Sequence, residues 1–109
     1  MKSYAYIDIE TNGVDSIFCE IIHFSAMKIY AGKTEYFDKY AKPKNKLTAK
    51  TEELVKITNK DLENCESFET VREEFLAFLG DAVIICFNPE FVERFLKTDF
   101  PEKGKVILP

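Results

Sequence analysis

The sequence predicts one α/β domain over residues 1–109, with strands and helices in the order β-β-β-α-α-β-α-β. Three features support this fold class. An alternating strand pattern opens the chain and is followed by a hairpin pattern. A strong amphipathic helix pattern covers residues 67–80, and a continuous apolar run over residues 82–87 is typical of a buried strand. A chain of this length can bury one core.

The first predicted strand lies in the stretch 4–14, YAYIDIETNGV, and runs out into a loop where the turn dipeptide Asn12-Gly13 breaks the alternation. Because residues two apart share a strand face, Asp8 and Glu10 project the same way, with Cα atoms about 7 Å apart. Two such carboxylates repel each other unless a cation such as Mg²⁺ or Mn²⁺ neutralises them. The pattern by itself supports a solvated strand face as well as it supports this metal site.

A hairpin pattern follows. The apolar, β-branched run over residues 18–30 predicts a second strand, a turn is expected at Gly32-Lys33, and residues 34–41 predict a third strand. The basic segment 42–46, KPKNK, is stiffened by Pro43. A solvated connection is favoured here over a loop that faces phosphate groups.

The middle of the chain predicts two helices separated by a turn. Residues 48–55 predict a short helix with Thr48 as its N-cap, and Thr58-Asn59 predicts a turn. The longer helix begins at Ser67 and ends at Gly80. Its apolar residues recur at helical spacing and indicate a face packed on the core: Phe68, Val71, Phe75, Phe78 and Leu79.

The last part of the chain predicts a strand, a helix and a strand. Residues 82–87, AVIICF, predict a strand buried on both faces. Asn88-Pro89 leads into a helix over residues 90–97, with Pro89 near its first turn. Residues 105–108, KVIL, predict a short final strand.

Charge and cysteine content limit the possible functions. A net charge of −4 gives no general basic surface, so any contact with nucleic acid would depend on bound metal and local lysine clusters. Cys19, Cys65 and Cys86 are odd in number and widely spaced, which favours reduced thiols in a cytoplasmic protein. No signal peptide precedes the first strand, and no apolar run approaches the roughly 20 residues of a membrane span.

Five segments together resemble the DnaQ-like (DEDD) 3′–5′ exonuclease family, in particular its proofreading and RNase T-type members. They are YIDIETNG, EIIHFSAMKI, FDKYAKP, ITNKDLENCESFETVREEFLAFLGD and IICFNPEFVERFL, in that order along nearly the whole chain. The resemblance implies a ribonuclease H-like fold. Such a fold has a five-stranded mixed sheet with the first strand at its centre and helices packed on the sheet.

The resemblance also implies site residues. In this family four carboxylates hold two divalent metals, Mg²⁺ or Mn²⁺, which activate water and stabilise the leaving 3′ oxygen. Asp8 matches the carboxylate that bridges both metals, and Glu10 matches one that holds a single metal. Residues matched to substrate binding are Thr11, Asn12, Gly13 and Val14, in the loop that receives the 3′-terminal nucleotide, and Asn88 and Phe91 of the second motif.

The second motif departs from the family pattern H-N-x-x-F-D. Its histidine is Phe87 and its carboxylate is Val92. Glu90 and Glu93 lie nearby, but each helical residue is rotated about 100° from the next, so neither would point where Val92 does. The third motif, with the fourth carboxylate and the general base, does not occur in the given sequence. His23, the single histidine, is interpreted as a packed or hydrogen-bonded strand residue rather than the base.

Two functions follow as expectations. The first is a degenerate exonuclease-like domain, inactive alone, that binds nucleic acid or protein, because two carboxylates cannot fix two ions about 4 Å apart. The second is a metal-dependent exonuclease completed by another chain or by a further segment. Val92 favours the first, since truncation would not alter the second motif. A fragment that folds but has no function of its own is the third possibility.

The sheet face that carries Asp8 and the Tyr4/Tyr6 row would be covered by a C-terminal helix in the family. Without that helix we expect apolar surface to be exposed. The expected partners are therefore a second copy or another protein on this face, together with a nucleic-acid 3′ end at the site. No membrane partner is expected.

Overall fold

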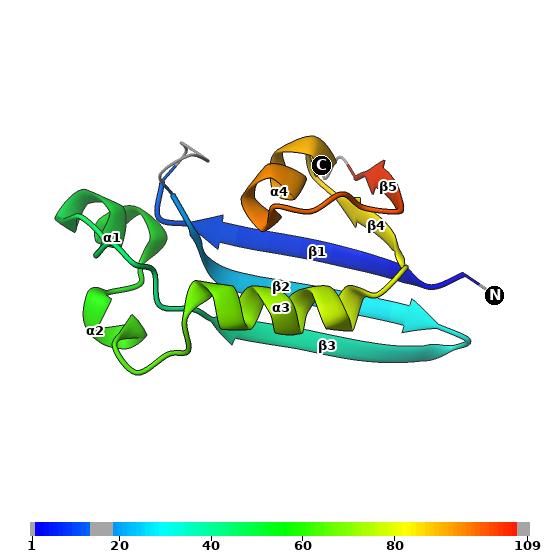
Figure 1. Ribbon diagram of the computed structural model, residues 1–109, viewed down its shortest axis with the longest axis horizontal. Coiled ribbons are helices and arrows are strands. Elements are labelled where there is room, and N and C mark those ends of the chain that lie inside the picture. Colours follow the sequence, from blue (N-terminus) through cyan, green and yellow to red (C-terminus); the bar gives the residue numbers. More distant parts are fainter. Residues whose placement is uncertain (1, 14–18, 107–109) are drawn as a thin grey trace.

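The computed structural model describes residues 2–13 and 19–106 (Figure 1). The strands are β1 (Tyr4–Thr11), β2 (Ile21–Tyr30), β3 (Lys33–Tyr40), β4 (Val83–Cys86) and β5 (Glu102–Lys105), and the helices are α1 (Ala49–Val55), α2 (Asn59–Leu62), α3 (Phe68–Leu79) and α4 (Pro89–Leu96). None of these helices has the length and apolar character needed to cross a membrane.

All five strands form one sheet in the order β3-β2-β1-β4-β5. β2 runs antiparallel to both β1 and β3, whereas β4 runs parallel to both β1 and β5. The predicted mixed five-stranded sheet with the first strand at its centre is therefore confirmed.

Helices α3 and α4 lie on the same face of the sheet (Figure 1). The crossovers from β3 to β4 and from β4 to β5 move in the same direction across the sheet, so right-handed connections place both helices on one side. We call the other side the open face, because no helix covers it among the described residues. The row of β1 side chains on this face includes the half-exposed Tyr4 and Tyr6.

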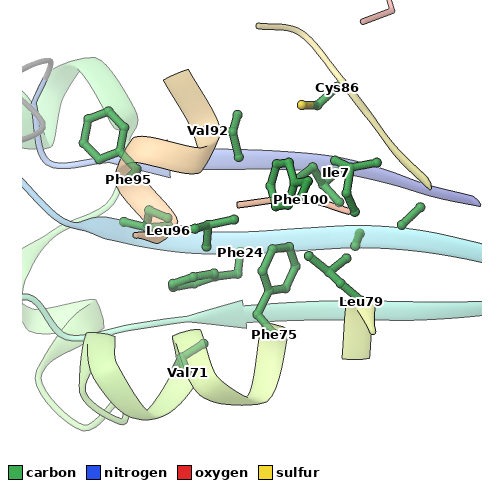
Figure 2. Packing of buried hydrophobic residues seen from close by; sticks show 14 of the residues in the cluster. Ile7, Phe24, Val71, Phe75, Leu79, Cys86, Val92, Phe95, Leu96 and Phe100 are labelled. Carbon is green, nitrogen blue, oxygen red and sulfur yellow. The ribbon is translucent and has the colours of Figure 1, made fainter. Parts of the chain in front are cut away.

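The main core lies between the sheet and these two helices (Figure 2). Ala5 and Ile7 of β1 point into it, as the alternating pattern predicts. Phe24 of β2 packs edge-on against Phe75 of α3, with ring centroids 5.2 Å apart. Helix α4 contributes apolar side chains to the same cluster, namely Val92, Phe95 and Leu96. The apolar stripe predicted on the longer helix is therefore part of the core.

Two predictions around the helices and turns need correction. The predicted turn at Thr58-Asn59 is the start of α2, where the Thr58 hydroxyl accepts from the Asp61 N–H and an Asp61 carboxylate oxygen accepts from the Thr58 N–H. A helix of four residues is too short for its periodicity to stand out. The hairpin turn lies at Ala31-Gly32, where both residues have positive φ, rather than at Gly32-Lys33.

The predicted final strand is present but begins earlier than the predicted range 105–108, and of the two residues of that range that the structure describes, only Lys105 lies in the strand. Strand β5 is Glu102–Lys105, which pairs with β4 so that Val83 lies opposite Glu102 and Cys86 opposite Lys105. The segment EKGK has no apolar strand pattern, so the sequence did not indicate a strand there. It forms an edge strand because backbone pairing with β4 can hold it without apolar side chains. Residues 107–109 lie outside the described part of the chain.

A buried carboxylate connects α4 to the segment that leads into β5. Glu93 accepts a hydrogen bond from the backbone N–H of Phe100 at 2.6 Å, and its other oxygen accepts from the Lys103 ammonium. The hydrogen bond from Lys103, followed by that from Phe100, lowers the pKa of Glu93 below its ordinary value of 4.5. The ionised form of Glu93 is therefore the one that stabilises this part of the fold.

This pKa shift predicts a pH-dependent contribution to stability. A carboxyl group with a lowered pKa in the folded protein stabilises it fully above the unfolded-state pKa and loses that effect as pH falls through the folded-state value. We expect Glu93→Gln to lower the free energy of unfolding by about 1–3 kcal/mol at neutral pH. The difference from the wild type should shrink as pH drops below about 4, measured by urea unfolding at several pH values.

Glu90→Gln on the same helix is the matched control. Its side chain is exposed and lies 3.8 Å from the Lys103 ammonium, so its loss should change stability by less than about 0.5 kcal/mol. An equal loss for Glu93→Gln at neutral and acidic pH would contradict the role assigned to the charge.

Candidate active site

Strand β1 places Asp8 and Glu10 on the open face of the sheet. Asp8 lies opposite Ser25 and Glu10 opposite His23 in the neighbouring strand β2. The Glu10 side chain is 44% exposed, and Asp8 is also exposed. The two carboxylates therefore share one face, as the strand pattern predicts, and both reach water.

His23 lies between two carboxylates on this face. Its Nε2 atom is 2.6 Å from an oxygen of Asp38, and its Nδ1 atom is 3.7 Å from an oxygen of Glu10. The ring also stacks on Tyr40, with centroids 4.3 Å apart. The side chain is only 18% exposed, which agrees with the interpretation of His23 as a packed and hydrogen-bonded residue.

Sequence reasoning missed Asp38 as part of this cluster. Asp38 lies on β3 directly opposite Ser25, and Ser25 lies opposite Asp8 on β1. Residues directly opposite one another across a sheet share a face, so the alternation of side chains along the three strands could have placed Asp38 on the face of Asp8. Using it would have required the pairing register of the predicted hairpin.

A second group of predicted residues meets at a pocket between β1 and α4. β4 pairs with β1 only as far as Tyr6, and beyond that point the edge of β1 opens toward the start of α4. The pocket has a volume of about 320 Å³ and is lined by Ile7, Asp8, Ile9, Cys86, Phe87, Asn88, Phe91 and Val92. The fold thus brings Asp8 to the predicted second-motif residues Asn88 and Phe91.

Asn88 caps helix α4. It has left-handed backbone angles, which asparagine tolerates better than most residues, and its side-chain oxygen accepts from the Phe91 N–H at 3.3 Å. Pro89 follows in the first turn. Phe91 packs edge-on against Phe95, with ring centroids 4.7 Å apart. Both predicted substrate-binding residues therefore also have a structural role.

The loop after β1 is held by local hydrogen bonds. The Thr11 hydroxyl bonds to the backbone of Gly13, and Asn12 exchanges two hydrogen bonds with the backbone of Glu20, at 3.0 and 2.8 Å. A Cβ atom added to Gly13 would lie 2.5 Å from the sulfur of Cys19, so a side chain there would displace Cys19. Val14, the fourth predicted residue of this loop, lies outside the described residues.

The donor set near Asp8 suits a hard cation poorly. Within residues 2–13 and 19–106, no group of three or more His, Cys, Asp and Glu side chains gathers closely enough to hold a metal ion. Asp8 and Glu10 could share one Mg²⁺ only with waters completing its shell. Burial raises the pKa of the nearby Cys86 thiol to about 11, so this thiol stays protonated at neutral pH and offers no thiolate ligand.

Comparisons with known proteins agree with this geometry. The model of a family described as exonuclease, of the RNase T type, matches residues 6–109. A PolC-type DNA polymerase III of Thermotoga maritima is 38% identical over 96 residues, which cover 87% of this chain and 7% of that protein. The corresponding protein of Halalkalibacterium halodurans is 35% identical over 104 residues, covering 94% of this chain and 7% of that protein. The chain therefore spans about 7% of the length of these relatives.

Solved structures share the fold. Escherichia coli exonuclease I in complex with an oligonucleotide superposes with a TM-score of 0.78 at 12% identity, covering 95% of this chain and 27% of that chain. Exonuclease X in complex with 5′ overhanging duplex DNA gives a TM-score of 0.69 at 17% identity, covering 93% of this chain and 57% of that chain. At these identities the likeness shows the ribonuclease H-like fold. Since the family model spans nearly the whole sequence, this chain belongs to the DnaQ-like 3′–5′ exonuclease family.

Proposed function

We propose that this chain is an exonuclease-like domain that binds nucleic acid or a protein partner and does not hydrolyse phosphodiester bonds by itself. The observation that carries this proposal is the place of Val92. Its side chain is 5% exposed and packs in the core (Figure 2). It also lines the same pocket as Asp8. A valine therefore stands where the family resemblance calls for a metal-binding carboxylate, and among the described residues that line the pocket only Asp8 is acidic.

The neighbouring acidic residues of α4 are poor replacements. Glu93 points away from this pocket, to the Phe100 backbone and the Lys103 ammonium. Glu90 is exposed and lies near the same lysine. Two-metal hydrolysis needs ions about 4 Å apart with ligands around both. Asp8 and Glu10 alone do not supply those ligands.

Phe87 supports a binding role. It stands in place of the second-motif histidine, is 68% exposed and borders the Asp8 pocket. The ammonium of Lys105 lies 5.2 Å from the centre of its ring. An exposed aromatic ring beside a lysine suits stacking of a nucleobase together with a contact to phosphate. The ligand we propose here is the 3′ end of a nucleic-acid strand.

The open face supports a protein partner. Tyr4, Tyr6 and Tyr36 lie on it, with Tyr36 exposed over most of its surface. Tyrosine contributes apolar area at little entropic cost and is enriched in interfaces. A second copy of the chain or another protein could cover this face.

An alternative is a metal-dependent exonuclease, acting on DNA or RNA, whose site is completed by another chain or a further segment. The observation that favours it is that Asp8 and Glu10 are both present and both reach water on the open face. A segment packed on that face could bring further carboxylates to them.

Activity assays separate these two functions. We expect no ladder of shortened products when the chain is incubated with end-labelled single-stranded DNA or RNA in Mn²⁺. Asp8→Ala should give the same result as the wild type, because the wild type already lacks the ligands for a second ion. Shortened products that disappear in Asp8→Ala would overturn the proposal in favour of the alternative.

Restoring the missing carboxylate tests the role of position 92. We expect Val92→Asp to lower the free energy of unfolding by about 1–3 kcal/mol without metal, because a carboxyl group is placed in the core. Mn²⁺ should then raise the melting temperature of this variant more than that of the wild type, since an ion bound only by the folded state stabilises it. Thermal denaturation with and without Mn²⁺ measures both effects.

Val92→Asn is the matched control, with the same shape but no charge. An equal Mn²⁺ shift for Val92→Asp and Val92→Asn would show that position 92 does not face the metal-binding carboxylates.

A further inference from the structure

Positive charge is concentrated in one segment of this acidic chain. Residues 42–60 contain six lysines and two glutamates, although the whole chain has a net charge of −4. The segment includes α1 and the start of α2, which lie beyond the end of the sheet at which β1 and β3 finish (Figure 1). The acidic pair on β1 lies toward the same end of the sheet.

Part of this segment forms a pocket of about 400 Å³, which we call the lysine pocket. Its lining comes from the loop after β3 and from α2 and the residue after it: Lys42, Pro43, Lys46, Asn59, Lys60, Leu62 and Glu63. Three lysines thus line one concave site, together with a single glutamate. Among the described residues, none of the three lysines forms an ion pair.

Hydrogen bonds fix the walls of the lysine pocket. The Asn59 side chain accepts from the Leu47 N–H at 2.7 Å and donates to the Leu47 carbonyl at 2.9 Å. On the other side, Lys42 donates its N–H to the Glu66 carbonyl, and its own carbonyl accepts from the Phe68 N–H. The backbone that carries the lysines is therefore held in place without a ligand.

The lysine pocket is connected to the loop after β1. The Lys44 N–H donates to a Glu20 carboxylate oxygen at 2.7 Å. The Glu20 carbonyl in turn accepts from the Asn12 N–H, and the Glu20 N–H donates to the Asn12 side-chain oxygen. On the open face, Tyr40 at the end of β3 stacks on His23, which lies beside Glu10. Two sets of contacts therefore join the start of this segment to the loop after β1 and the end of β3 to the strand residue beside Glu10.

We propose that the lysine pocket binds backbone phosphates of a single-stranded nucleic acid whose 3′ end lies at the Asp8 pocket. This inference rests on the proposed function, because it takes the position of the 3′ end from it. Lysine ammonium groups are suited to phosphate as mobile point charges. The rest of the chain is acidic and repels an anionic strand, so phosphate contacts should concentrate at this pocket.

The test measures binding of a fluorescent single-stranded oligonucleotide by anisotropy over a range of salt concentrations. Lys46→Gln with Lys60→Gln removes one charge from each wall of the pocket. Lys33→Gln with Lys50→Gln is the control, with the same loss of charge outside the pocket. Circular dichroism melting verifies that each variant is folded, which is expected because exposed substitutions change stability by less than about 0.5 kcal/mol.

We expect the pocket variant to bind about tenfold more weakly at low salt than the wild type. The slope of log affinity against log salt concentration should become shallower by about 1.4, the value for two phosphate contacts on a single strand. The control variant should stay within about twofold of the wild type. An equal loss of affinity in the pocket variant and the control variant would indicate diffuse electrostatic attraction and overturn the inference. The inference would also be overturned if the wild type bound a polyglutamate peptide of similar length as tightly as it binds the oligonucleotide.

Failure of this inference and failure of the proposed function give different results. If Asp8→Ala abolishes strand shortening while the pocket variant binds normally, the chain is an active exonuclease and the lysine pocket is not a phosphate site. If no strand is shortened and the pocket variant binds weakly, both proposals are supported. If the wild type binds no oligonucleotide at low salt, the proposal that the lysine pocket binds phosphate is overturned, and the protein-binding role is the part of the proposed function that is left.

Discussion

Strand β1 lies between β2 and β4, and only one of its faces is packed under helices. Because strand side chains alternate, the burial of Ala5 and Ile7 forces Asp8 and Glu10 onto the open face. A shift of one residue in the register would place the carboxylates in the core and Ile7 in water. Burying two unpaired carboxylates would cost several kcal/mol each, so core packing alone fixes where the acidic pair points.

At position 92 of helix α4, core packing and the metal-binding motif of the family favour different side chains. The first turn of the helix is set by the Asn88 cap, and Glu93 fixes its other side to the segment before β5. With the helix held in this way, the side chain at position 92 both lines the pocket of Asp8 and packs in the core. The family resemblance calls for a carboxylate there, whereas packing favours an apolar side chain, whose burial contributes about 1.5–3 kcal/mol. This chain has the side chain that packing favours.

The elements predicted from the sequence are those with a recognisable local pattern of apolar residues. β1 alternates, α3 has a long apolar stripe, and β4 is a continuous apolar run, so each was predicted within a few residues. The missed elements lack such a pattern, because α2 spans one turn and β5 is a polar edge strand held by its neighbour. The pairing of His23 with Asp38 and the walls of the lysine pocket depend on contacts between distant segments. No local pattern encodes such contacts.

The acidic pair by itself does not require a metal ion. In the sequence, two carboxylates on one strand face suggested a cation, because their repulsion must be offset. In the structure, both carboxylates reach water, and His23 lies beside Glu10 with its other ring nitrogen hydrogen-bonded to Asp38. Hydration weakens the repulsion to about 1 kcal/mol or less at the separation of two strand neighbours. The fold can therefore keep Asp8 and Glu10 without metal, and evidence for an ion must come from the ligands beyond this pair, which is why Val92 decides the interpretation of the site.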